Sequence, residues 1–196
     1  MTDLIDSAYF SKIKEEIENY DHKREEVVKD SNKIVKLSKN VIYSVHRNNL
    51  DSAQKVLDEM KSILERLNKE ISNNSKLNVG AYKVAVQEYV EALCYLEYNK
   101  GNKLPTHEEI GLEGVDVEYY LLGLCDLAGE LSRNALNSAI DGDLDSVNKV
   151  RSFMNSLYEE LMLIDFRNGE LRKKVDGIRY EVQKLNNLVF DLNKKS

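Results

Sequence analysis

Hydrophobic residues recur every three or four positions along almost the whole chain, which is the spacing of one face of an α-helix. Polar turns separate these stretches, and no alternating pattern of useful length predicts a β-strand. The pattern predicts helices over residues 3–47, 52–71, 79–98, 118–140, 144–164 and 171–192, with a short additional helix starting at Thr106. We therefore expect an all-α fold, a bundle of about six or seven helices in one domain spanning residues 1–196.

The first predicted helix is unusually long. It reads either as one continuous helix over residues 3–47 or as two helices with a soft break near residues 20–22. At a rise of roughly 1.5 Å per residue, an unbroken helix spans more than about 50 Å. This exceeds what a domain of this size needs for its own core, and an over-long helix often reaches outward to a neighbouring subunit.

The stretch 119–138 has two unlike sides when its residues are placed at 100° intervals. One side is apolar, and the nearly opposite side carries Asp126 and Glu130. These two carboxylates lie one turn apart and are therefore neighbours, an arrangement that costs free energy unless a cation offsets it. The apolar side comprises Leu121, Leu124, Ala128, Leu131 and Ala135, and the polar side also carries Tyr119, Arg133 and Asn137.

A second acidic pair lies in the helix predicted over residues 79–98. Glu88 shares its face with apolar and aromatic residues, and Glu91 flanks that face. A carboxylate in an apolar stripe is costly to bury unless it is paired or ligated. If the two acidic helices pack at about 8–10 Å, four carboxylates converge, and such hard oxygen ligands suit Mg²⁺ or Mn²⁺. From spacing alone, however, both pairs are also compatible with solvated or salt-bridged helix surfaces.

Composition places the chain among globular proteins rather than disordered ones, with 42% hydrophobic and 32% charged residues. The net charge of −6 argues mildly against a plain nucleic-acid binder, although local basic patches matter more than the total. Neither a membrane-spanning apolar run nor the pattern of a signal peptide is visible in the sequence. Cys94 and Cys125 fall within predicted helices and read as buried thiols. We therefore expect a cytoplasmic protein without a membrane partner.

Residues 119–133, together with 137–138 and 142–143, closely resemble the core signature of the translin and translin-associated factor X (TRAX) family. Residues 171–182 are similar to the C-terminal helix of translin, and residues 24–47 resemble, more weakly, the long first helix of the family. The resemblance covers nearly the whole chain and implies the translin-like helical fold.

The family has a branch that binds single-stranded nucleic acid, translin, and a branch that cleaves single-stranded RNA, TRAX. The stretch 87–92 resembles the TRAX form because Glu91 stands where translin has a basic residue, and Asp126 is likewise acidic only in TRAX. The C-terminal helix is closer to translin. This mixture implies one polypeptide that serves as both catalyst and scaffold in a homo-oligomer, which by resemblance is an octamer.

The resemblance implies a metal-dependent endoribonuclease that acts on single-stranded RNA, with Mg²⁺ or Mn²⁺ as cofactor, and single-stranded DNA is a second candidate ligand. Its catalytic and metal-ligating residues are Glu88, Glu91, Asp126 and Glu130, with Glu130 or Glu88 as the proton acceptor. Lys36, Lys39, Arg47 and Arg133 are candidate phosphate contacts, although Arg133 can instead pair with Glu130. Two alternatives remain open: a non-catalytic translin-like binding protein, and a helical scaffold whose acidic cluster is surface charge.

Overall fold

The computed structural model describes residues 6–112 and 114–195, and every regular element within them is helical. The predicted all-α fold is confirmed, with six α-helices and one short 3₁₀ turn in the described residues. The elements are α1 (Ser7–His46), α2 (Leu50–Asn73), the 3₁₀ turn η1 (Ser75–Leu77), α3 (Gly80–Lys100), α4 (Val117–Ile140), α5 (Leu144–Met162) and α6 (Glu170–Lys195). The predicted start of the first helix at residue 3 lies outside the described residues.

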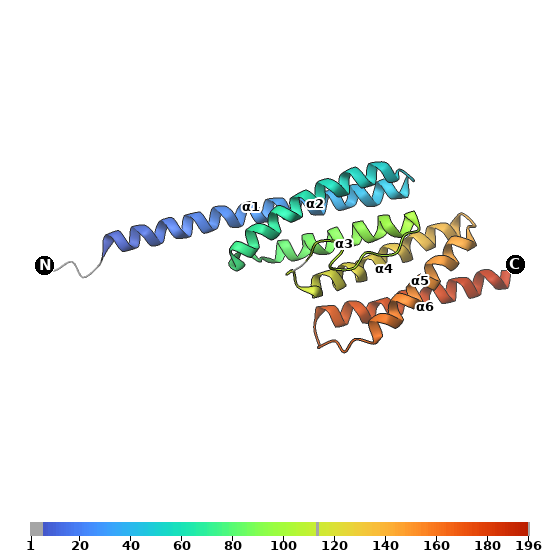
Figure 1. Cartoon of the computed structure of the whole chain (residues 1–196). Coiled ribbons are helices and arrows are strands. Elements are labelled where there is room, and N and C mark those ends of the chain that lie inside the picture. Colours follow the sequence, from blue (N-terminus) through green and yellow to red (C-terminus); the bar gives the residue numbers. More distant parts are fainter. Residues whose placement is uncertain (1–5, 113, 196) are drawn as a thin grey trace.

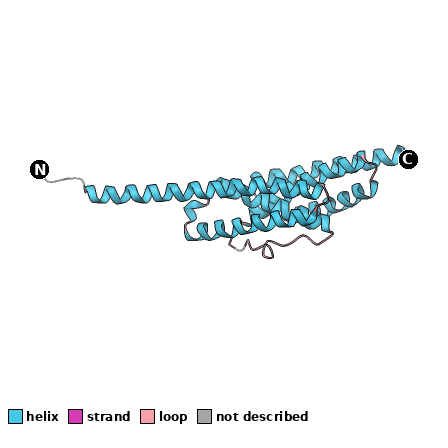
Figure 2. Ribbon diagram, turned by 90° about the horizontal axis from the view of Figure 1, so that it is seen from above, coloured by secondary structure: helices cyan, strands magenta, loops and turns pink. Residues whose placement is uncertain are grey.

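The helices lie roughly side by side in an elongated bundle, with α1 and α2 at one side and α5 and α6 at the other (Figure 1). The first helix is continuous over its 40 residues, without a break near residues 20–22. Its N-terminal half extends beyond the bundle, so that the start of α1 and the end of α6 lie at opposite ends of the molecule (Figure 2). Residues 7–26 are accordingly almost all exposed.

The two central helices are α3 and α4. Helix α3 packs against α1, α2 and α4, whereas α4 also packs against α5 and α6. Burying one large apolar side chain contributes about 1.5–3 kcal/mol, and these contacts bury side chains from all six α-helices. The fully buried large residues include Ile34, Met60, Tyr95, Leu96, Leu127, Leu131, Met154 and Leu185.

Gly123 allows α3 and α4 to approach closely. A Cβ atom at this position would lie 2.7 Å from the Val90 Cβ and 2.8 Å from the Gln87 carbonyl oxygen. Real Cβ atoms do not approach other atoms so closely, so any larger residue forces the two helices apart. Because Gly123 has no side chain, the α4 residues around it pack directly against the α3 residues around Val90.

The short helix predicted from Thr106 is not formed, and residues 107–111 make turns instead. The expected capping interaction is present, because the Thr106 amide donates to Glu109 and the Glu109 amide donates to the Thr106 hydroxyl. The chain then leaves the helical conformation at Gly111, where φ is +74°. A left-handed residue this close to the cap prevents the first turn from continuing as a helix.

None of the helices in residues 6–112 and 114–195 combines the length and apolar character needed to cross a bilayer.

Candidate functional site

Glu91 of α3 lies near Asp126 of α4, one turn from the position where Gly123 brings the helices together. Glu88 is half-buried and accepts a hydrogen bond from the hydroxyl of Ser38, a fully buried residue of α1. Glu91, about one turn further along α3, is also half-buried. The predicted acidic pair of α3 therefore lies inside the bundle, against both α1 and α4.

Glu91 has the most perturbed carboxyl group of the site. Burial, and then the neighbouring carboxylates of Glu88 and Asp126, raise the pKa of Glu91 to about 7, while Arg133 and Lys174 oppose the change. Electrostatic coupling of this kind requires that the groups lie within several ångströms of one another. Two of the other three predicted site carboxylates, Glu88 from the same helix and Asp126 from α4, therefore lie near Glu91.

Asp126 is held by a lysine of the last helix. The Lys174 ammonium lies 2.7 Å from Oδ1 and 2.7 Å from Oδ2 of Asp126. Both side chains are partly buried, with 31% of the Lys174 side chain and 36% of the Asp126 side chain exposed. The contact joins α4 to α6 and offsets one negative charge of the acidic cluster.

Glu130 lies deeper than the polar side of an amphipathic helix would suggest, with only 3% of the residue exposed. The reason is that the end of α1 covers it: His46 Nε2 lies 2.8 Å from Oε1 of Glu130, and the guanidinium of Arg133 pairs with Oε2. The Tyr95 hydroxyl lies 3.4 Å from the same His46 nitrogen. Burial, and then the nearby Arg133 charge, lower the pKa of His46. Because a carboxylate oxygen only accepts hydrogen bonds, His46 Nε2–H is the donor to Glu130.

The chemistry of these side chains fits a hard divalent cation, but their present arrangement does not. All four acids offer oxygen ligands, and the repulsion around Glu91 is what a bound cation relieves. However, Asp126 is bound to Lys174, and Glu130 is bound to His46 and Arg133. In the part of the chain that the structure describes, no group of three or more His, Cys, Asp and Glu residues is placed to hold a metal ion.

The predicted phosphate contacts lie in different environments. Arg133 pairs with Glu130, which was the alternative to a phosphate contact, and 66% of its side chain is still exposed. Lys36 and Lys39 are exposed on the C-terminal half of α1, the half that brings Ser38 and His46 to the site. Arg47 is exposed at the C-cap, directly after the last residue of α1. Their contact with nucleic acid stays a prediction.

Sequence reasoning missed two members of the site, Ser38 and Lys174. Ser38 had a detectable signal, because it is a small polar residue in helical register with the apolar residues Ile34 and Val41. Lys174 had none, because it contacts a residue 48 positions away and looks like any other lysine of an amphipathic helix.

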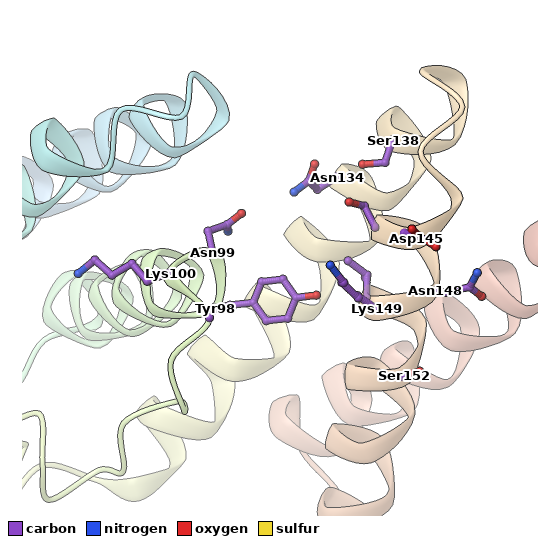
Figure 3. A pocket seen from close by; sticks show the side chains of 12 residues that line it. Tyr98, Asn99, Lys100, Asn134, Ser138, Asp145, Asn148, Lys149 and Ser152 are labelled. Atoms are coloured by element: carbon purple, nitrogen blue, oxygen red, sulfur yellow. The ribbon is translucent and has the colours of Figure 1, made fainter.

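A separate polar cleft of about 850 Å³ lies where the C-terminal end of α3 meets α4 and α5 (Figure 3). Asn134 and Ser138 line it from α4, one and two turns beyond Glu130. Tyr98 and Lys149 point toward one another across it (Figure 3). The cleft thus continues along α4 from the carboxylates, with amide, hydroxyl and ammonium groups on its walls.

Comparison with known proteins identifies the family. The model of the Translin family matches residues 22–194. An uncharacterised protein of Methanocaldococcus jannaschii is 33% identical over 85% of this chain and 74% of its own length. Translin of Gallus gallus is 32% identical over 57% of this chain, and the match spans about half (54%) of that protein. Translin-associated protein X of Mus musculus is 26% identical over 93% of this chain and 77% of its own length.

Solved structures agree over nearly the whole chain. The crystal structure of apo-NeC3PO is 32% identical, with a TM-score of 0.85 over 92% of this chain and 95% of that one. The structure of AfC3PO with duplex RNA is 26% identical, with a TM-score of 0.84 over 95% of this chain and 97% of that one. The resemblance to translin and TRAX is thereby confirmed, and the chain belongs to the Translin family.

Proposed function

We propose that this protein is a metal-dependent endoribonuclease that acts on single-stranded RNA within a closed helical homo-oligomer. The observation that carries the proposal is the gathering of Glu88 and Asp126 around Glu91, whose pKa is raised to about 7 by burial and by these two carboxylates. A helical protein gains no stability from a half-buried Glu91 that two neighbouring carboxylates repel. Their clustering is better explained by a cation that they bind during function.

In this proposal Glu88, Glu91 and Asp126 hold Mg²⁺ or Mn²⁺. Such an ion, when bound, offsets charge on a phosphate and lowers the pKa of a coordinated water. The proton acceptor is Glu88, because both oxygens of Glu130 are already taken by His46 and Arg133. Glu130 is then a positioning residue that anchors the Arg133 guanidinium, whose exposed part faces an incoming phosphate.

The nucleic-acid path follows α4. Arg133 stands beside the carboxylates, and Asn134 and Ser138 continue into the polar cleft, where Tyr98 and Lys149 lie opposite. Lys39 and Arg47 add positive charge on the neighbouring helix, α1. AfC3PO has been solved with duplex RNA, which supports RNA as the class of ligand and makes a duplex the necessary comparison in any assay.

The oligomer that we propose is a homo-octamer, on the basis of the family resemblance. The exposed N-terminal half of α1 supports assembly, because it carries apolar side chains that no other part of the described chain, residues 6–112 and 114–195, covers. Sites that face an enclosed cavity admit a flexible single strand more readily than a stiff, wide duplex.

A second candidate function is non-catalytic binding of single-stranded RNA or DNA. It is favoured by the ion pairs of Asp126 with Lys174 and of Glu130 with Arg133, which neutralise two of the four acids without a metal. This alternative predicts salt-dependent binding and no turnover.

A cleavage assay separates the two functions. Fluorescent single-stranded RNA and its duplex are incubated with the wild-type protein in Mg²⁺, in Mn²⁺ and in EDTA, and then with Glu88→Gln and Asp126→Asn. We expect cleavage of the single strand only with metal and a loss of at least about a hundredfold in each variant. Binding without cleavage supports the second function, and cleavage in EDTA refutes the metal-dependent one.

A further inference from the structure

Lys174 places a positive charge inside the acidic cluster. Its ammonium lies 2.7 Å from each carboxylate oxygen of Asp126. It therefore contacts both of the atoms through which Asp126 would bind a metal ion. It also opposes, to a small extent, the rise in the pKa of Glu91 that burial and the other carboxylates cause. The protein therefore supplies its own monovalent cation at the acids that we propose as metal ligands.

The lysine is not locked in this position. It extends from α6 across to α4, and 31% of its side chain is exposed. A groove of about 240 Å³ lies beside it, between the two helices, lined by Asp126, Lys174 and Glu181 and by Gly129 and Gly177. An added Cβ would meet nothing within 4 Å at either glycine. The ammonium thus has open space into which it can withdraw.

An ammonium and a divalent cation cannot both sit closely against one carboxylate, because their mutual repulsion is strong at a partly buried site. We propose that Lys174 is a resident counter-ion of the acidic cluster, which holds Asp126 while no divalent cation is bound and must release it before Asp126 can ligate one. Lys174 therefore sets the metal affinity of the site. This inference rests on the proposed metal-binding role of Asp126, and it adds a residue from α6 to a site otherwise built from α1, α3 and α4.

The test measures metal binding rather than cleavage. Mn²⁺ is titrated into the full-length protein by calorimetry, for the wild type and for Lys174→Met, which keeps the length of the side chain and removes its charge. We expect Lys174→Met to bind Mn²⁺ about tenfold more tightly, since no ammonium has to be displaced. Weaker or unchanged Mn²⁺ binding in Lys174→Met overturns the proposal.

Lys173→Met is the matched control. Lys173 is exposed on the same helix, and its substitution changes the net charge equally without touching the Asp126 contact. We expect its Mn²⁺ affinity to stay within about twofold of the wild type, because the field of an exposed charge is screened by solvent. An equal gain in Mn²⁺ affinity in both variants would show that the gain comes from the change in net charge, and it would refute a specific role for Lys174.

Thermal unfolding guards against misfolded variants and provides a second readout. Without metal, Lys174→Met and the alternative Lys174→Gln should melt below the wild type, since Asp126 loses its partner. Saturating Mn²⁺ should raise the Tm of both variants by more than it raises that of the wild type, and adding Asp126→Asn should remove this gain. An Mn²⁺-induced Tm increase in the variants no larger than in the wild type contradicts the proposal.

The outcomes also separate this inference from the proposed function. Tighter Mn²⁺ binding by Lys174→Met, in a protein that cleaves no RNA, refutes the nuclease and leaves the counter-ion role standing. Metal-dependent cleavage by the wild type, with no gain in Mn²⁺ affinity in Lys174→Met, supports the nuclease and refutes the counter-ion role of Lys174.

Discussion

The buried acids of the site differ in how their charge is compensated. Glu130 is the most deeply buried of them, yet His46 and Arg133 supply partners for both of its oxygens. Glu91 is set among Glu88 and Asp126, and the nearby cations only partly offset the effect on its pKa. An ionised Glu91 therefore destabilises the fold, and a bound cation would relieve this cost.

This destabilisation predicts a pH dependence. The pKa of Glu91 is raised from its ordinary 4.5 to about 7, so between these pH values the folded state holds a proton that the unfolded state has lost. Stability therefore falls as pH rises through this window. At pH 8 the unfolding free energy of Glu91→Gln should exceed that of the wild type by as much as about 3 kcal/mol. Near pH 4 the unfolding free energies of the two proteins should be equal. Urea unfolding across this range measures the difference.

Glu15→Gln is the control for that experiment, because it makes the same charge change at an exposed position of α1. It should leave stability nearly unchanged at both pH values. A Glu91→Gln variant that is no more stable than the wild type at pH 8 would show that neither burial nor the neighbouring carboxylates destabilise the ionised Glu91.

At this scale the sequence identified the acids better than their partners. Helical spacing paired Glu88 with Glu91 and Asp126 with Glu130, because neighbours on one helix follow from its period. Spacing could not show that Glu130 is buried beneath His46 or that Lys174 reaches Asp126. Those contacts depend on how separate helices pack, which no local pattern encodes.

Among the elements, the contact between α3 and α4 determines whether a site exists at all. Both acidic pairs were visible in the sequence, but their meeting was only a hypothesis. Gly123 is the physical reason that they meet, since its missing side chain accommodates Val90 and the Gln87 carbonyl of α3. The glycine was visible in the sequence, but the backbone that it accommodates was not. Helix boundaries, in contrast, follow local patterns, and most predicted ends lie within a few residues of those observed.

Gly123→Ala should therefore separate α3 from α4. The added methyl group overlaps Val90, and we expect a loss of about 1–3 kcal/mol in unfolding free energy, measured by urea denaturation. Because the carboxylates also move apart, the stabilisation of the protein by Mn²⁺ should decrease.

Gly129→Ala, on the same helix, is the matched substitution without an obstacle, since nothing lies within 4 Å of its added Cβ. It should be neutral or stabilising by up to about 1 kcal/mol, because alanine favours helix more than glycine does. Equal effects of the two substitutions would contradict the close-packing role of Gly123.

At the scale of the whole molecule, the main open question is why the N-terminal half of α1 projects beyond the bundle (Figure 1). Tyr9, Phe10 and Ile17 are exposed there, and together with the half-buried Ile13 they follow helical spacing on one side. The sequence predicted helix over this region but left open a break near residues 20–22, which the continuous helix Ser7–His46 excludes. It could not predict what covers the apolar side, because that surface lies outside the chain's own core.

If this surface joins subunits, Ile17→Asp should reduce the mass measured by light scattering, because a buried carboxylate without a partner destabilises the interface. Ser11→Asp introduces the same charge on the opposite side of the helix and should leave the mass unchanged. An oligomer that survives Ile17→Asp intact would exclude this part of α1 from the interface, and a monomeric wild type would refute the proposed assembly.

The most direct test of the central claim is the rate at which single-stranded RNA is cleaved with Mn²⁺, compared between the wild type and Asp126→Asn at equal oligomeric mass. The acidic cluster around Glu91 predicts Mn²⁺-dependent cleavage by the wild type and a decrease of at least about a hundredfold on neutralising Asp126. Equal rates in the two proteins, or no cleavage by a correctly assembled wild type, would contradict it.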